Sequence, residues 1–257
     1  MPQLMRTSNP ALRGDAFGPG EVAYGGETMT ISGAVNKTGI LIILCVATAA
    51  WTWNRFFGAL ATSPEDAMQS VALPAIVGGI GGFIVAMVTI FKKEWAGVTA
   101  PIYALLEGLV LGGVSALMEM RFHGIAIQAV ALTFGTLVAM LVAYRTGLIK
   151  VTDKLRLGIV AATGGIAVFY FLQFILGFFG IHFTTINGAT PIGIGFSVVV
   201  VIVAALNLVL DFDLIENGAR MGAPKYMEWY GAFALMITLI WLYFEILRLL
   251  SKVRSRN

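Results

Sequence analysis

At positions 207–218 the chain reads Asn207-Leu-Val-Leu-Asp211-Phe-Asp213-Leu-Ile-Glu216-Asn-Gly218. The run of about twenty residues from Pro191 to Leu210 that leads into it has no charged side chain, and such a run spans a bilayer as a helix. The Asn-Gly pair predicts a helix stop, which lies about 10 Å beyond Asp211 at a rise of ~1.5 Å per residue. Asp211 is therefore expected inside the membrane, where an ionisable side chain is a functional-site hypothesis by default.

The composition is that of an integral membrane protein. Of the 257 residues, 58% are hydrophobic and 12% are charged, and the mean hydropathy is +0.86, whereas a soluble domain carries roughly 25% charged residues. A net charge of +3 would fit a nucleic-acid binder, but the basic residues lie in short loops between apolar runs and so indicate membrane topology. We therefore expect contact with a lipid bilayer and no nucleic-acid partner.

Seven apolar runs are each long enough to cross a hydrocarbon core of ~30 Å. Backbone groups in lipid must be satisfied within their own segment, so each run is expected to be a helix. The fold class is predicted to be an all-α integral membrane protein, a seven-transmembrane-helix bundle over residues 37–250. A flexible N-terminal tail (1–36) and a basic C-terminal tail (251–257) flank it. The predicted spans are 37–57, 71–91, 98–120, 125–144, 157–179, 191–216 and 229–250.

The distribution of basic residues predicts that the N-terminus is cytoplasmic. With that orientation, most lysines and arginines fall in loops on the cytoplasmic side, as the positive-inside rule requires. The basic C-terminal tail disagrees, because seven spans place it outside. Either the tail is an exception to the rule, or one segment is re-entrant and both ends are inside. Seven spans are the favoured interpretation.

Four carboxylates fall within apolar runs: Glu107, Asp211, Asp213 and Glu245. No lysine or arginine is predicted at mid-membrane depth to neutralise them. Such carboxylates protonate, share a proton or bind a cation, and all three outcomes indicate cation or proton handling. Glu107 is expected about 15 Å from the cytoplasmic side, close to the depth of Asp211. These two are therefore candidate calcium ligands, since carboxylate oxygens suit a hard cation.

Each of these carboxylates also has a structural interpretation. Glu245 precedes Arg248 by three residues, a spacing that suits an ion pair on a helix surface. Asp213 would be solvated at the inner mouth of the bundle, and Glu107 would hydrogen bond to a serine or threonine. Asp211 would cap a helix or form a hydrogen bond to a neighbouring helix. The sequence leaves both interpretations open for all four.

Other patterns indicate packing and no catalysis. Gly78-x-x-x-Gly82 and Gly108-x-x-x-Gly112 have the spacing that lets membrane helices approach closely. The chain shows no zinc-ligand spacing, phosphate loop or nucleophile–histidine pair, so we expect no enzyme activity and no cofactor. An intramembrane aspartyl protease would need a second deep aspartate to accompany Asp211, and Glu107 is the available carboxylate at matched depth.

Three segments occur in an order typical of a known family: Phe91-Lys92-Lys93 leading to Tyr103-Ala-Leu-Leu-Glu107-Gly108-Leu-Val-Leu-Gly112; Leu210-Asp211-Phe-Asp213-Leu-Ile-Glu216; and Leu247-Arg248-Leu-Leu250. Over residues 37–250 the chain resembles the Bax-inhibitor family, also called the transmembrane Bax-inhibitor-motif family, in a bacterial branch. The resemblance implies six helices around a central seventh, in a bacterial cytoplasmic membrane. Bacterial members are associated with a pH-sensitive calcium leak, and eukaryotic members with calcium release and suppression of cell death.

The resemblance also implies a pH sensor made of two aspartates, one on the sixth helix and one on the seventh. Asp211 matches the first, but Thr238 stands where the second belongs. Glu245 lies two helical turns further on, roughly 10 Å away. Two hypotheses account for the missing second carboxylate. Either Glu107 supplies it from the third span, or Asp213 pairs with Asp211 near the inner mouth of the bundle. The depth estimate favours Glu107.

The basic residue that anchors the aspartate pair in the family would correspond to Lys92 or Lys93. The predicted function is a pH-sensitive cation leak channel, with calcium as the expected ion, gated by protonation of membrane-embedded carboxylates. The alternative is a non-transporting membrane stress or regulatory protein that binds a membrane protease or another membrane partner.

Overall fold

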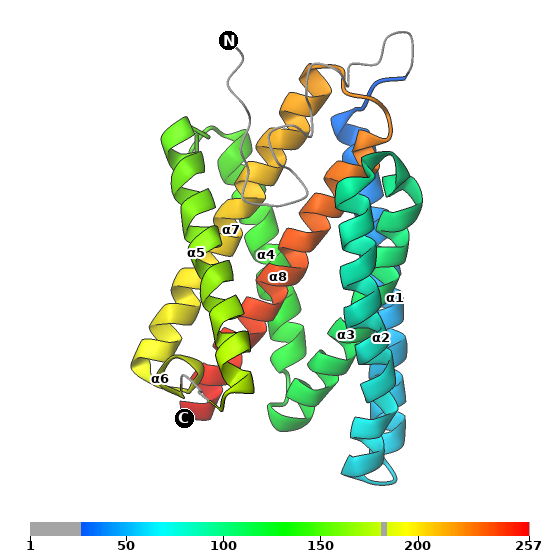
Figure 1. Cartoon of the computed structure of the whole chain (residues 1–257), viewed down its shortest axis with the longest axis vertical. Coiled ribbons are helices and arrows are strands. Elements are labelled where there is room, and N and C mark those ends of the chain that lie inside the picture. The colour runs from blue at the N-terminus through cyan, green and yellow to red at the C-terminus, as the bar shows by residue number, and fades with distance from the viewer. Residues whose placement is uncertain (1–26, 181–183, 257) are drawn as a thin grey trace. The chain divides into compact units, whose positions relative to one another are not determined.

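The computed structural model describes residues 27–180 and 184–256, which form an all-helical protein with no strand in these ranges (Figure 1). Seven helices are long and apolar enough to cross a membrane. The short helices η2 (Lys93–Trp95) and α6 (Thr184–Asn187) lie between them, so the predicted sixth and seventh spans are α7 and α8. The prediction of a seven-span helical membrane protein is confirmed. The long helices are α1 (Ile31–Leu60), α2 (Pro64–Phe91), α3 (Ala96–Arg121), α4 (Ile125–Arg145), α5 (Asp153–Phe178), α7 (Pro191–Arg220) and α8 (Met227–Arg256).

The chain divides into two compact units, and both contain parts of α7 and α8. The α1–α3 unit comprises residues 27–126 and 214–236, and the α4–α7 unit comprises residues 127–213 and 237–256. Helix α8 is the most buried of the seven, with 67% of the residues in its most apolar stretch buried.

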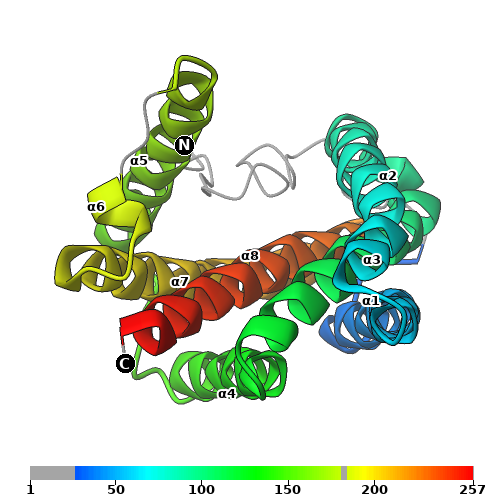
Figure 2. The same ribbon diagram turned by 90° about the horizontal axis from the view of Figure 1, so that it is seen from below.

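Glycines set the spacing of the three long helices in the α1–α3 unit, which lie side by side in both views (Figures 1 and 2). A Cβ atom at Gly108 or at Gly112 would lie 2.2 Å from a backbone carbonyl oxygen of α1. At Gly78 it would lie 2.5 Å from the Leu106 carbonyl oxygen of α3. Real Cβ atoms do not approach oxygen that closely, so the observed α1–α3 and α2–α3 packing requires glycine. The close packing predicted from the glycine pairs is confirmed.

Two helices begin earlier than the apolar pattern predicts, because polar side chains cap them. Thr30 Oγ1 accepts a hydrogen bond from the Gly33 backbone N–H at 2.9 Å, so α1 begins at Ile31 and includes residues 31–36 of the predicted tail. Ser63 Oγ accepts from the Asp66 N–H at 3.1 Å, with proline at the first position of α2. Such caps satisfy free N–H groups at helix starts. The rest of the predicted tail, residues 1–26, lies outside the described residues.

The C-terminal ends of α7 and α8 lie beyond their predicted positions. The predicted stop at Asn217-Gly218 is wrong, because α7 continues to Arg220 and the chain turns at Gly222, whose φ is +70°. A left-handed glycine is the usual residue just after a helix end. Helix α8 extends to Arg256 through most of the predicted basic tail. Basic side chains in the last turn of each helix interact favourably with its negative dipole end.

The segment Glu27–Thr30, here called the N-terminal clasp, is hydrogen bonded to the loop between α7 and α8. The Met29 N–H donates to the Ala223 carbonyl at 2.8 Å, and the Lys225 N–H donates to the Glu27 carbonyl at 3.1 Å. Met29 is buried. The clasp therefore holds the chain just before α1 against the chain just before α8.

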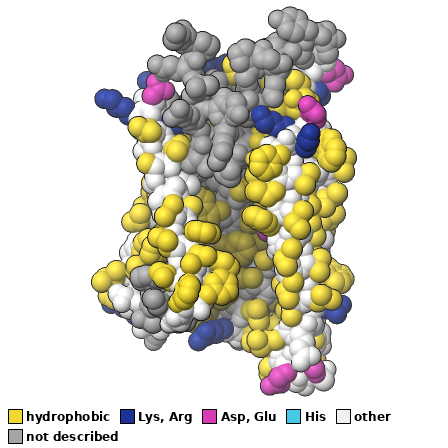
Figure 3. Space-filling model, viewed as in Figure 1, with side chains coloured by type: hydrophobic (Ala, Val, Ile, Leu, Met, Phe, Trp, Pro, Cys, Tyr) yellow, Lys and Arg dark blue, Asp and Glu magenta, His cyan; other side chains and the backbone are white. Residues whose placement is uncertain are grey.

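Large hydrophobic side chains cover most of the visible face of α2 (Figure 3). Water contact with such a long apolar face is unfavourable, because transferring apolar surface into water costs roughly 25 cal/mol per Å². This face of α2 therefore suits contact with lipid tails. The exposed large hydrophobic residues of α2 are Met68, Leu73, Ile76, Val77, Ile80, Phe83, Ile84 and Phe91.

Candidate functional site

Asp211 lies on α7, nine residues before the helix ends at Arg220, and its exposed fraction is 0%. The adjacent side chains of Leu210 and Leu214 are also buried. The structure thus places the carboxyl group in an apolar section of a membrane-spanning helix, in the α4–α7 unit. Burial in such a medium disfavours a charged carboxylate unless a cation or hydrogen-bond donors compensate it.

Asp213 forms an ion pair with a residue of α5. Arg156 Nη2 lies 2.6 Å from Asp213 Oδ2, and the side chains are 18% and 16% exposed. The Tyr144 hydroxyl of α4 also donates to Asp213 Oδ1, at 3.4 Å. Asp213 therefore connects α4, α5 and α7. The expectation that the carboxylates have no fixed counter-ion is wrong for Asp213, because α5 begins at Asp153 and contains Arg156 in its first turn.

Replacing Arg156 by Gln is expected to destabilise the protein by about 1–3 kcal/mol, between the values for exposed and buried ion pairs. The reason is that a half-buried carboxylate loses its charge partner. Thermal unfolding in detergent of Arg156→Gln, Asp213→Asn and the double variant measures the coupling between the two side chains. In the double variant the loss should be smaller than the sum of the two single losses; additive losses would contradict a coupled pair.

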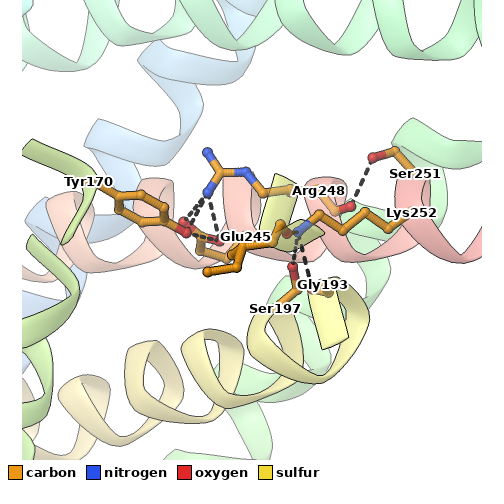
Figure 4. Close-up of polar contacts among 8 residues, drawn as sticks. Tyr170, Gly193, Ser197, Glu245, Arg248, Ser251 and Lys252 are labelled. Atoms are coloured by element: carbon orange, nitrogen blue, oxygen red, sulfur yellow. Dashed lines mark hydrogen bonds and ion pairs between the residues drawn. The ribbon is translucent and has the colours of Figure 1, made fainter. Parts of the chain in front are cut away.

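Glu245 lies on α8 in contact with Arg248 and Tyr170 (Figure 4). Arg248 Nη1 is 3.2 Å from Glu245 Oε1, and the Tyr170 hydroxyl donates to Oε2 at 3.2 Å. The guanidinium also lies 4.9 Å from the centre of the Tyr170 ring. The predicted pairing of Glu245 with Arg248 is confirmed. Within this pair the Glu245 side chain is 3% exposed and the Arg248 side chain is 43% exposed.

Glu107 lies on α3 in the α1–α3 unit, against α2. A Cβ atom on Gly82 would lie 2.9 Å from Glu107 Oε1, so that glycine leaves room for the carboxyl group. The Tyr103 hydroxyl, one turn earlier on the same helix, hydrogen bonds to Glu107, and the expected bond to a serine or threonine stays a prediction. The Tyr103 ring packs edge-on against Phe233 at 5.0 Å between centroids.

The four candidate carboxylates do not lie in one compact unit. Asp211, Asp213 and Glu245 belong to the α4–α7 unit, and Glu107 belongs to the α1–α3 unit. Thr238, which stands in place of the second family aspartate, is buried on α8 in the α4–α7 unit. The pairing of Asp211 with Glu107 stays a prediction.

A family model described as "Bax inhibitor 1 like" matches residues 9–255 of the chain. The chain belongs to the Bax inhibitor 1-like family. The match includes all seven membrane-spanning helices apart from the last residue of α8. Neither the comparison with curated proteins nor that with solved structures found a match. The resemblance stated from the three sequence segments is thereby confirmed at the level of the family.

Lys92 and Lys93 separate α2 from α3 in this Bax inhibitor 1-like protein. Lys92 is exposed at the C-terminal end of α2. Lys93 begins η2, and its Nζ lies 6.0 Å from the centre of the Tyr230 ring on α8, within cation–π range. Both lysines belong to the α1–α3 unit, whereas Asp211 belongs to the other. Their role as an anchor for Asp211 stays a prediction.

Glu228, in the first turn of α8, is a buried charged residue that the sequence did not single out. Its exposed fraction is 0%. Lys37 Nζ pairs with Oε2, and Lys225 Nζ lies 3.2 Å from Oε1. The backbone N–H and the hydroxyl of Thr30 also donate to Oε1, at 2.8 and 2.9 Å.

The Glu228 carboxylate thus fastens the N-terminal clasp and α1 to α8. A Cβ atom on Gly33 would lie 2.1 Å from that carboxyl group, so a larger residue at this position would displace the Glu228 side chain. A glutamate in the first turn of a helix is an ordinary pattern. The sequence therefore gave no signal for a buried ion pair with a partner 191 residues away.

Over residues 27–180 and 184–256, no group of three or more His, Cys, Asp or Glu side chains is arranged to hold a metal ion. The calcium ligands proposed from the sequence, Asp211 and Glu107, are two carboxylates from different units.

Proposed function

We propose that this Bax inhibitor 1-like protein is a pH-sensitive leak for cations, with calcium as the expected ion, gated by protonation of carboxylates in its membrane helices. The observation that supports this best is Asp211, a carboxyl group with no exposed surface in an apolar stretch of α7. When ionised, it attracts a cation, since carboxylate oxygens are good ligands for hard cations. When protonated, it loses the charge, and the attraction for a cation falls.

The other carboxylates receive different roles in this proposal. Asp213 pairs with Arg156 at 2.6 Å. Its proposed role is therefore structural: it holds α5 against α7 close to Asp211, the residue proposed to change its protonation state. Glu107, on α3, is proposed as a further carboxylate of the ion pathway, because Gly82 leaves space beside its carboxyl group. We further propose a bacterial cytoplasmic membrane as the location, with the N-terminus on the cytoplasmic side.

Replacing Asp211 by Asn is expected to reduce calcium flux several-fold and to flatten its dependence on pH, because the amide neither ionises nor attracts a cation. The measurement uses purified protein in liposomes loaded with a calcium dye, between about pH 5 and pH 8. Glu216→Gln is the matched control, because Glu216 lies on the same helix in an exposed pair with Arg220. Equal flux and equal pH dependence for the wild type and Asp211→Asn would remove Asp211 from the site.

A folded wild-type protein without flux at any pH would instead support the alternative function. In that case the protein is a non-transporting regulator that binds a membrane protease or another membrane protein, and Asp211 has a structural role. Purification with a mild detergent would then be expected to recover that membrane partner together with the protein.

A further inference from the structure

Lys252, in the last two turns of α8, is a buried cation surrounded by neutral oxygen atoms (Figure 4). Its exposed fraction is 6%. The Nζ atom lies 2.8 Å from the Ile186 carbonyl oxygen, 2.9 Å from Ser197 Oγ and 3.1 Å from the Gly193 carbonyl oxygen. In the described part of the chain, no carboxylate forms an ion pair with Lys252.

The nearest acidic residue on the same helix is already neutralised. Glu245 pairs with Arg248, whose Nη1 lies 3.2 Å from one carboxylate oxygen and 3.3 Å from the other. The ammonium group of Lys252 therefore adds a positive charge that no contacting anion balances. Burying a charge is unfavourable unless hydrogen bonds or a partner compensate it, so the three oxygens must hold the ammonium group.

The oxygens match the ammonium group in number and in kind. A lysine ammonium has three N–H donors, and each of the three oxygens is a neutral acceptor on α6 or on the first turns of α7. Carbonyl oxygens of this kind replace the hydration shell of potassium in selective channels. An ammonium ion and a potassium ion are similar in size and charge, so the same oxygens suit either cation.

The first turn of α7, which begins at Pro191, carries the positive end of its helix dipole and opposes a cation nearby. The ammonium group is thus retained by its oxygen contacts and by its covalent attachment to α8. Once the attachment is removed, the oxygens are left without the donors that satisfied them.

We propose that Ile186, Gly193 and Ser197 form a monovalent-cation site whose resident cation is the ammonium group of Lys252. The lysine side chain, which is covalently attached to α8, fills the site. When this side chain is removed, a free potassium or ammonium ion occupies the site. This inference concerns binding at the end of α8 and does not depend on the calcium leak proposed above.

The test measures thermal unfolding of the full-length protein in detergent, in chloride salts of choline, sodium, potassium or ammonium at equal ionic strength. Lys252→Ala should have a lower Tm than the wild type in choline chloride. Potassium or ammonium should restore about half of that loss in a saturable manner, because a ligand that binds the folded state stabilises it. The wild type should show no such preference. A Lys252→Ala protein that responds equally to all four salts would overturn the proposal.

Two variants control for general destabilisation. Arg254→Ala removes a more exposed basic residue of the same helix, which bonds to Gln128 at 2.8 Å, and it should not discriminate between the salts. Adding Ser197→Ala to Lys252→Ala removes one of the three oxygens and should reduce the recovery in potassium or ammonium several-fold. Equal recovery with and without the Ser197 hydroxyl would contradict the assigned ligands.

A separate measurement keeps the lysine in place, in case Lys252→Ala does not fold in any salt. Ser197→Ala alone should increase the labelling rate of Lys252 by an amine-reactive reagent several-fold over the wild type, measured by mass spectrometry. The reason is that the ammonium group loses one of its three acceptors and leaves the site more often. An unchanged labelling rate would overturn the proposal.

Discussion

Replacing Glu228 by Ala is expected to lower the free energy of unfolding by about 3–5 kcal/mol, the usual loss when a buried ion pair loses one member. The Glu228 side chain has no exposed surface and accepts four contacts, from Lys37, Lys225 and the backbone and hydroxyl of Thr30. Lys37 is only 18% exposed, so its ammonium group would remain half-buried without its partner.

Thermal and denaturant-induced unfolding in detergent measures this loss. Glu216→Gln is the matched control, because its pair with Arg220, whose side chain is 70% exposed, should contribute only about 0.3–0.5 kcal/mol. Combining Glu228→Gln with Lys37→Met should recover part of the loss by removing both charges. A Glu228→Ala variant as stable as Glu216→Gln would show that the buried carboxylate does not stabilise the fold.

The Glu228 variant should also release the N-terminal clasp. Hydrogen exchange at the backbone amides of Met29 and Thr30 should become faster, because Thr30 loses its acceptor and Met29 is held beside it. The amides in the middle of α3 provide the reference. Unchanged protection at both clasp positions would mean that the clasp is held by its contacts with the α7–α8 loop and not by Glu228.

Two glycine-to-alanine substitutions are expected to change stability in opposite directions. Gly112→Ala should destabilise the protein by about 1–3 kcal/mol, because its Cβ would lie 2.2 Å from the Ala49 carbonyl oxygen and force α1 away from α3. Gly79→Ala should be neutral or stabilise by up to about 1 kcal/mol, because its Cβ meets nothing within 4 Å and alanine favours helix.

Thermal unfolding of these two variants in the same detergent gives the comparison directly. Both substitutions add a methyl group to a glycine within a helix. The difference in Tm between the two variants therefore measures the effect of the close approach of α1 and α3. A Gly112→Ala variant with the same or higher Tm than Gly79→Ala would contradict the tight α1–α3 contact.

The membrane spans could be predicted from the sequence because each is determined by a local run of apolar residues. All seven were located, and errors were confined to helix ends. Residues such as Ser63 and Thr30 extend a helix outward through caps that hydropathy does not detect. The glycine pairs also signalled close packing correctly, since the spacing of small residues is itself a local pattern.

The partners of the carboxylates could not be predicted from the sequence, because they are distant along the chain. Asp213 and Arg156 are 57 residues apart, and Glu228 and Lys37 are 191 residues apart. Local spacing did predict the pairing of Glu245 with Arg248, because the two residues lie within one helical turn of each other. Hydropathy places a charged residue by depth only, and it does not show which neighbouring helix presents the opposite charge.

The contact between Lys37 and Glu228 has a consequence for the biosynthesis of the protein. Lys37 is in the first membrane helix, and its partner is synthesised 191 residues later, after about 10–40 s at ordinary rates of translation. During that interval Lys37 lacks the carboxylate with which it pairs in the folded protein. The N-terminal end of the molecule is therefore completed only when the last helix arrives, and a chain truncated before α8 exposes a charged group that cellular quality control can recognise.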